Sequence, residues 1–280
     1  MAEVRYAYAD IAFRPVGPAR GSFEVENRFY FTSLDGYDIV YTVEADGKAV
    51  RSGTVRLQTA PQQRETVDAA RAEYGDDLAV VCYVNSTVEI KSWSDVCVTS
   101  SNAVKIVSEL PQQHVLFIPD QNLGRFVAEQ VPQKHVILNN GYCPRHHIIT
   151  VEQIVDAKEA PPDALVLAHP ECKADVLTEA DYIGSTAGII KYAEESDASE
   201  FIIVTVRGVL YELERRCQGT GKKFYFPAVQ PTCVNMDLIT LEKLVRCLET
   251  GEGEVQIGVS DEAADQAKLT LDRMLEYAAR

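Results

Sequence analysis

Apolar side chains in the first quarter of the chain recur at nearly every second position, which is the period of a strand with one buried face. Phe, Tyr, Ile and Val follow this spacing in residues 23–31 and 37–43, and polar residues stand mostly between them. Asp46-Gly47 is a pair typical of a type I′ hairpin turn, and Val50 resumes the next strand. We therefore expect residues 1–67 to form a small antiparallel β segment, part of a sandwich.

The pattern changes near residue 68, where amphipathic helical runs begin to alternate with short, continuously apolar runs. The strand-like runs cover 80–85, 95–100, 114–120, 135–140, 164–170, 181–185, 201–206 and 223–228. The helical runs cover 68–77, 102–110, 123–131, 151–160, 187–196, 207–217, 238–250 and 260–280. Continuous apolar strands between amphipathic helices indicate a parallel sheet covered on both faces. The predicted fold class is α/β.

Composition and charge limit the classes of function. Apolar residues make up 46% of the chain and charged residues 25%, and no run of 18 apolar residues occurs, so we expect a globular protein with no membrane span. The N-terminus lacks the basic and apolar regions of a signal peptide, which predicts a cytoplasmic location. The net charge of -15 argues against nucleic-acid binding, because phosphates would be repelled. It leaves room for a small anionic substrate in a locally positive pocket.

Polar residues that follow the predicted strands are candidates for a binding site, since open parallel sheets bind ligands outside the carboxyl ends of their strands. They are Tyr83, Asn85, residues 99–102 and 120–122, Asn139, Asn140, residues 143–147, His169, Glu171, Cys172 and residues 184–186, with Cys233 as a weaker case. For any single hydroxyl or amide residue in this set, helix capping alone could explain its position. Two segments, SSNA and GSTAG, join hydroxyl residues to a helix start, whose N–H groups and positive dipole favour an anion. Together they predict a ligand with carboxylate or phosphate groups.

The seven cysteines divide into two groups. Cys82, Cys97, Cys217 and Cys247 fall inside predicted strands or helices, whereas Cys143, Cys172 and Cys233 fall in loops after strands. The first group suits buried core thiols, and the second suits metal ligands. The stretch NNGYCPRHH at 139–147 leaves three interpretations open: a metal site, a cysteine nucleophile with its histidine base, and a polar turn.

Several longer motifs carry a family resemblance. They are YVNSTVEIKSWSDVCVTSSNAVKIV, LFIPDQNLGRFVA, NNGYCPRHHIITVEQI, ALVLAHPEC, ADYIGSTAGIIKYA and CVNM. In these motifs the chain, from about residue 68 to its C-terminus, resembles quinolinate synthase, the iron–sulfur enzyme of NAD biosynthesis. The resemblance implies αβα layers around a pseudo-threefold axis. Here they would form one domain at 68–145 and a second at 146–280 that includes the C-terminal helix.

The resemblance also implies a site. One cysteine from each third of the family fold binds a 4Fe-4S cluster whose fourth iron is open to substrate. By position, Cys143 and Cys233 match two cluster ligands, Tyr83, Asn85 and Ser100 match substrate contacts, and His146, His169, Glu171, Ser185 and Thr186 match the rest of the pocket. The residues expected to be catalytic are Tyr83, His146, His169 and Glu171. The implied reaction condenses iminoaspartate with dihydroxyacetone phosphate, and an aspartate oxidase that supplies iminoaspartate is an expected partner.

The first 67 residues depart from that family. Its first cluster cysteine is expected near Val55, but no cysteine precedes Cys82. The stretches VRYAYADIAFRPV and GSFEVENRFYFTSLDGYDI instead resemble a β-sandwich segment of large β-galactosidases. We therefore expect this chain alone to bind the cluster poorly.

Three other functions compete with a quinolinate synthase. The chain could be an inactive or partner-dependent form that exposes an apolar face. Its N-terminal segment could bind carbohydrate, although the aromatic residues have the spacing of a core. A zinc hydrolase that uses Cys143, His146 and His169 would be separated from an iron–sulfur enzyme by metal analysis.

Overall fold

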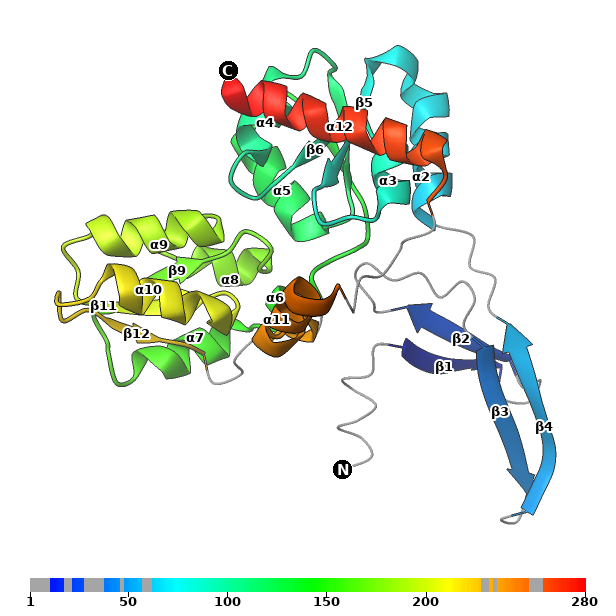
Figure 1. Cartoon of the computed structure of the whole chain (residues 1–280), viewed down its shortest axis with the longest axis horizontal. Helices are drawn as coiled ribbons and strands as arrows, with labels where there is room; N and C mark the ends of the chain where they lie inside the picture. The colour runs from blue at the N-terminus through cyan, green and yellow to red at the C-terminus, as the bar shows by residue number, and fades with distance from the viewer. Residues whose placement is uncertain are drawn as a thin grey trace. The chain divides into compact units, whose positions relative to one another are not determined.

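The computed structural model describes the backbone of four N-terminal strands and most of the chain from residue 62 onward. The described residues are 11–17, 22–27, 38–45, 48–56, 62–227, 232–233, 236–251 and 259–280. They belong to two compact units, residues 1–69 and residues 70–280 (Figure 1). The domain boundaries predicted at 67 and 145 stay predictions.

The N-terminal unit contains two antiparallel strand pairs. Strand β1 (Ile11–Gly17) pairs with β2 (Ser22–Asn27), and β3 (Asp38–Ala45) pairs with β4 (Lys48–Arg56). Ala45 is opposite Lys48, so two residues connect β3 to β4, which confirms the hairpin expected at this position. The predicted turn type and the predicted parity of the side chains lie outside the described residues.

A four-stranded parallel sheet forms the first layer of the second unit. Its order is β6-β5-β7-β8, from β5 (Leu78–Tyr83), β6 (Val96–Val98), β7 (His114–Ile118) and β8 (His135–Leu138). The helices in this part of the chain are α2 (Gln62–Tyr74), η2 (Gly75–Asp77), α3 (Val88–Ser92), α4 (Ala103–Glu109) and α5 (Gln121–Gln130). All six residues of β5 are buried, as a parallel strand covered on both faces requires.

A second parallel sheet repeats this plan. Its order is β10-β9-β11-β12, from β9 (Leu165–Ala168), β10 (Tyr182–Ile183), β11 (Glu200–Val204) and β12 (Lys223–Tyr225). The helices that follow β8 are α6 (Pro144–His147), α7 (Val151–Lys158), α8 (Ala174–Thr178), α9 (Thr186–Glu195), η3 (Arg207–Val209), α10 (Leu210–Arg216), η4 (Met236–Leu238), α11 (Leu241–Thr250) and α12 (Asp261–Ala279). Both sheets confirm the predicted α/β class.

Alternate residues of the central strands pack on opposite faces of the second sheet. Val166 and Ala168 of β9 belong with Val204 of β11 to one buried cluster, and Leu167 belongs with Ile203 to the other. Burial on both faces explains why these strands read as continuous apolar runs rather than as alternating ones.

The strand order of each sheet determines where its functional loops lie. In both sheets the first strand is central, the second is an edge strand, and the third lies on the other side of the first. The direction in which successive strands are added to the sheet therefore reverses between β5 and β7, and likewise between β9 and β11. Loops that leave the carboxyl ends of such neighbouring strands open a crevice, which is the usual ligand site of this architecture.

The last helix, α12, packs on the first sheet layer, where it contacts α3, β6 and α4 (Figure 1). Its Thr270 hydroxyl lies within hydrogen-bond distance of the carbonyls of Ser94 (2.9 Å) and Lys91 (3.0 Å), and Arg273 donates to the Asp95 carbonyl. Ser260 caps its start by accepting from the Ala263 N–H. None of the described helices, α12 included, has both the length and the hydrophobicity to cross a membrane.

Candidate active site

The loop at 139–147 is fastened to the turn between β7 and α5. The buried carboxylate of Asp120 accepts from the N–H of Leu123, which caps α5, and from the N–H of Cys143, each at 2.7 Å. The Gln121 N–H donates to the Gly141 carbonyl at 2.7 Å. One carboxylate thus fixes both a helix start and the position of the Cys143 backbone.

A single helical turn brings His146 next to the Cys143 thiol. Cys143 occupies the N-cap of α6, and Pro144 begins the helix, where a missing N–H costs nothing. Residues three apart on a helix are neighbours, and His146 Nδ1 lies 3.2 Å from Cys143 Sγ. The other ring nitrogen, Nε2, lies 3.0 Å from Oγ1 of Thr205, which is fully buried at the end of β11.

The loop after β9 adds a buried carboxylate and a second histidine. Glu171 Oε2 lies 2.9 Å from His146 Nδ1 and 3.5 Å from His169 Nδ1. The two imidazole rings stack with centroids 4.7 Å apart. Donor atoms of Cys143, His146 and Glu171 all lie within 4.8 Å of one another, so these three residues could hold a metal ion.

Burial and neighbouring charges set the protonation of this cluster. Burial, with the charge of His146, lowers the pKa of His169 to about 3, so His169 is neutral near pH 7. Burial alone raises the pKa of Glu171, but the hydrogen bond and charge of His146, together with His169 and Cys143, bring it below its usual value. Burial and the Glu171 carboxylate raise the pKa of the Cys143 thiol. Without a metal ion, the site therefore contains a carboxylate, a neutral imidazole and a thiol.

Asn122 connects the two layers at this point. Its side-chain N–H₂ donates to the Glu171 carbonyl at 3.0 Å and lies 3.2 Å from His147 Nδ1. Burial, with the charges of Lys173 and Arg125, lowers the pKa of His147, so its neutral ring can accept. The same ring stacks on Tyr142 with centroids 4.0 Å apart. His147 thus supports Asn122, which in turn positions the backbone of Glu171.

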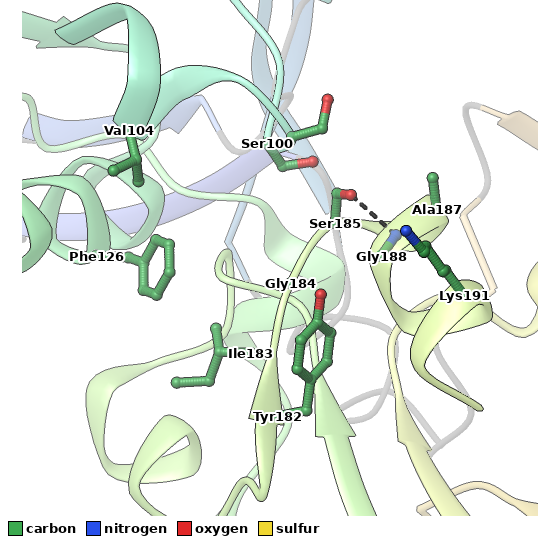
Figure 2. A pocket seen from close by; sticks show the side chains of 11 residues that line it. Ser100, Val104, Phe126, Tyr182, Ile183, Gly184, Ser185, Ala187, Gly188 and Lys191 are labelled. Atoms are coloured by element: carbon green, nitrogen blue, oxygen red, sulfur yellow. Dashed lines mark hydrogen bonds between the residues drawn. The ribbon is translucent and has the colours of Figure 1, made fainter. Parts of the chain in front are cut away.

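Ser100 lies where the buried cluster meets an open pocket. Its Oγ is 3.2 Å from His169 Nε2, and it also hydrogen-bonds with the buried Tyr83, whose pKa is raised by burial and by Glu171. The pocket has a volume of about 440 Å³, and its lining includes Ser100, Phe126, Tyr182, Ser185 and Lys191 (Figure 2). Ser185 caps α9 by accepting from the Gly188 N–H at 3.1 Å. A hydroxyl, a helix start and an ammonium group on one pocket wall suit an anion.

Comparison with known proteins decides which family this site belongs to. A model of the family described as quinolinate synthetase A protein matches residues 57–276. The chain belongs to this family.

Its relatives are named quinolinate synthase. The one from Fusobacterium nucleatum is 48% identical over 203 residues, which cover 72% of this chain and 66% of the relative. Those from Caldicellulosiruptor saccharolyticus and Methanoregula boonei are 44% and 41% identical and are covered to 69% and 68%, over 76% and 75% of this chain. The chain thus spans about two thirds of the length of the curated relatives it matches. The β-galactosidase resemblance of residues 1–67 stays a prediction.

For this member of the quinolinate synthetase A family, the structure brings most of the predicted site residues together. Cys143, His146, His169, Glu171, Ser100 and Tyr83 form one connected cluster, and Ser185 shares the pocket with Ser100. Thr186 is the first residue of α9, and Asn85 is exposed two residues after Tyr83. Cys233 is half-buried, and its carbonyl accepts from the Asp237 N–H. These roles stay predictions.

Three of the four cysteines predicted to be core thiols, Cys82, Cys97 and Cys217, are buried. The prediction is wrong for Cys247, which is half-buried on α11, a helix with no buried residue. Cys82 and Cys97 touch each other at 3.5 Å inside the first sheet. Cys172 is fully buried, and its thiol points to the Val204 carbonyl at 3.7 Å. The sequence placed Asn122 among the candidates that follow a predicted strand, but it did not indicate Thr205 or Lys191. Thr205 had a detectable signal, because it directly follows a central strand of its sheet.

Proposed function

We propose that the chain catalyses the quinolinate synthase reaction of NAD biosynthesis. Iminoaspartate and dihydroxyacetone phosphate would condense to quinolinate, with release of phosphate and two waters. The observation that carries this proposal is the buried cluster of His146, Glu171 and His169 at the crevice of a quinolinate synthetase A family fold. Such a condensation needs several proton transfers beside an anionic substrate, which these groups can supply.

The residues divide the work by their protonation. Glu171 is a carboxylate paired with His146, so this pair takes up and returns a proton. His169 is neutral and held between Ser100 and the Glu171 backbone, so it polarises a bound group without adding charge. Tyr83, Asn85, Ser100 and Thr186 are proposed substrate contacts. Ser185 at the start of α9 and Lys191 nearby would hold the phosphate or a carboxylate.

The proposed cofactor is a 4Fe-4S cluster with Cys143 and Cys233 among its ligands. When bound, such a cluster supplies an open iron that acts as a Lewis acid. The described residues do not complete it, because a cluster takes cysteine thiolates at its irons and Cys143 is the one thiol in the buried cluster of described residues. No cysteine precedes Cys82 to serve as the first ligand. The residues here therefore fit the cluster poorly.

The proposed setting follows from the thiols and the substrates. All seven cysteines are free, which suits a reducing compartment, and we propose the cytoplasm. An aspartate oxidase that releases iminoaspartate is the proposed partner, because an imine in water hydrolyses unless it is used quickly.

Two measurements test this proposal. Calorimetric titration with quinolinate should show binding to the chain that weakens in Ser185→Ala. Binding should not change in Ser196→Ala, which removes a half-buried hydroxyl at the other end of α9. Anaerobic reconstitution should give clearly fewer than four irons per chain. Absence of quinolinate binding would contradict the proposed function, whereas four irons with quinolinate formed would contradict only the poor cluster fit.

A second candidate, an inactive or partner-dependent chain, is favoured by one observation. Leu241, Leu244, Val245 and Leu248 recur on α11 at the spacing of one helix face, and all four are exposed. An exposed apolar stripe promotes association. Size-exclusion chromatography with hydrophobic-dye binding would detect it.

A further inference from the structure

We propose that Cys143, His146 and Glu171 bind a single zinc-class divalent ion, and that this ion and an iron–sulfur cluster on Cys143 exclude each other. This inference stands on the geometry of the three side chains and does not depend on the proposed function. It assigns the site a mononuclear metal, in place of the cluster that the described residues do not complete.

The spacing of the donor atoms suits one small ion. His146 Nδ1 is 2.9 Å from Glu171 Oε2 and 3.2 Å from Cys143 Sγ, and all three donors lie within 4.8 Å of one another. In tetrahedral zinc sites, bonds of about 2.0–2.3 Å put ligand atoms roughly 3.3–3.6 Å apart. The distances from His146 Nδ1 to Glu171 Oε2 and to Cys143 Sγ therefore need to lengthen by only a few tenths of an ångström to admit the ion. The side chains of His146 and Glu171 are already buried and held in place.

The surroundings of His146 allow it to act as a ligand through Nδ1. A ligating imidazole needs its lone pair on the nitrogen that faces the metal and its proton on the other. Here the other nitrogen, Nε2, lies 3.0 Å from the buried hydroxyl of Thr205. A hydroxyl can donate to a bare nitrogen or accept from an N–H, so Thr205 serves His146 in both tautomers. The proton can thus move to Nε2 when the metal binds, and the bond to Thr205 is kept. The contacts that Nδ1 makes with Glu171 and Cys143 are then replaced by their shared bonds to the ion.

His169 does not compete for the ion. Its Nδ1 lies 3.3 Å from the Glu171 N–H, which donates to it, and its Nε2 faces Ser100 Oγ at 3.2 Å. Both nitrogens are therefore already in use. Among the described His, Cys, Asp and Glu residues, only Cys143, His146 and Glu171 form a group of three or more whose ligand atoms all lie within 4.8 Å of one another. Three protein ligands with a fourth position left for water or substrate are typical of catalytic rather than structural zinc sites.

The donor types select the metal. One sulfur, one imidazole nitrogen and one carboxylate oxygen suit zinc, cobalt or iron(II), whereas magnesium and calcium require oxygen ligands. A thiolate and a carboxylate also neutralise a divalent ion, which relieves the cost of burying Glu171 beside Cys143. Zinc binds such a site more tightly than iron(II) does. A zinc-loaded chain would thus have its Cys143 thiolate occupied before an iron–sulfur cluster could use it.

Titration of the full chain with Co²⁺ tests the site, because thiolate-bound cobalt gives a sulfur-to-metal charge-transfer absorption. The metal-free, reduced chain should bind one Co²⁺, show that absorption, and release the cobalt to one equivalent of Zn²⁺. Cys143→Ser should abolish the absorption, and His146→Ala and Glu171→Gln should each weaken binding strongly. Thr205→Val keeps all three ligands and should weaken binding roughly 10–100-fold, the usual effect of losing a partner of a ligating histidine. Circular dichroism establishes that each variant folds.

Cys247→Ser is the matched control, since this thiol lies on α11 and should not affect cobalt binding. Cys233→Ser separates the two metals: it should leave one Co²⁺ bound while it lowers the iron count after reconstitution. Preloading with Zn²⁺ should likewise lower the iron count. The inference would be overturned if the wild-type chain bound no Co²⁺ or lacked the charge-transfer absorption. Equal Co²⁺ affinity of the wild type and Glu171→Gln would also overturn it. Quinolinate binding is measured separately, so its presence or absence does not decide this test.

Discussion

His146 Nδ1 lies 2.9 Å from Glu171 Oε2, and each side chain is only 6% exposed, so the pair is shielded from solvent. Residues in direct buried contact do not act additively. In a double-mutant cycle of His146→Gln and Glu171→Gln, we expect a coupling of about 0.5–3 kcal/mol in the free energy of unfolding, measured with urea at pH 7. The exposed pair Lys268–Asp272, changed to Gln and Asn, should show a coupling below about 1 kcal/mol. Equal coupling in the two cycles would contradict the special role of burial.

Asn122 should stabilise the junction between the two layers. Its amide donates to the Glu171 carbonyl and contacts His147, and it is buried. Asn122→Ala leaves that carbonyl without this donor, which should lower the free energy of unfolding by about 1–3 kcal/mol. Gln130→Ala, on the exposed end of the same helix, should change it by less than about 0.5 kcal/mol. Urea unfolding of both variants makes the comparison, and similar effects would argue against the bridge.

Gly141 is expected to tolerate no side chain. A Cβ at this position would overlap the backbone oxygen of Pro119, which cannot move as a flexible side chain would. Gly141→Ala should therefore cost about 1–3 kcal/mol of stability and displace the loop that carries Cys143. Gly208→Ala is the control, because a Cβ there meets nothing within 4 Å. If both variants unfold at the same urea concentration, the nearby Pro119 oxygen does not prevent a side chain at position 141.

Thr270 should attach α12 to the first layer through its hydroxyl. Thr270→Val keeps the shape but removes the donor to the carbonyls of Ser94 and Lys91, so we expect a loss of about 1–3 kcal/mol in thermal or urea unfolding. Thr178→Val removes an exposed hydroxyl that bonds only within its own turn, to the Asp175 carbonyl, and should have little effect. A loss of equal size in Thr178→Val would point to helix propensity instead.

Glu212 gives a pH dependence of known sign. Hydrogen bonds from Arg215 and Arg216 lower its pKa to about 2, so folding favours the charged carboxylate. The stabilisation is present above the ordinary pKa of 4.5 and is lost as the pH falls towards 2. The urea midpoints of wild type and Glu212→Gln should therefore differ slightly at pH 7 and converge in acid. Salt should reduce the difference, because the pair is at the surface.

The sequence predicted the layered part of the fold well, because burial on both faces leaves an unambiguous pattern. All eight predicted strands after residue 68 are present, from Leu78–Tyr83 to Lys223–Tyr225. Short helices such as Val88–Ser92 and Ala174–Thr178 were missed, since one turn of helix is too brief to show a period. The order of strands within each sheet was also out of reach, because pairing depends on long-range contacts.

The candidate site was predictable only where the residue type itself is typical of metal binding or catalysis. Cys143, His146 and Glu171 stand out as donors after strands, and the structure does bring them together. Asn122 and Thr205 carry ordinary amide and hydroxyl groups, and their importance comes from partners 49 and 59 residues away in the chain. The position of Asp120 after a strand is typical of a helix cap, and one carboxylate oxygen does cap α5. The other oxygen accepts a hydrogen bond from the Cys143 N–H. Such double use is decided by the fold alone.

The attachment of α12 to the first layer has a consequence for how the chain matures. Met274 and Tyr277 pack against the core that contains Val81 and Val98, yet a ribosome makes them after every other described element. Domains usually begin to fold as soon as their residues emerge. Here the layer that is translated first must wait, with part of its core uncovered, until α12 has been made, whereas the layer translated second can close earlier. The nascent first layer therefore exposes part of its apolar core until α12 has been made.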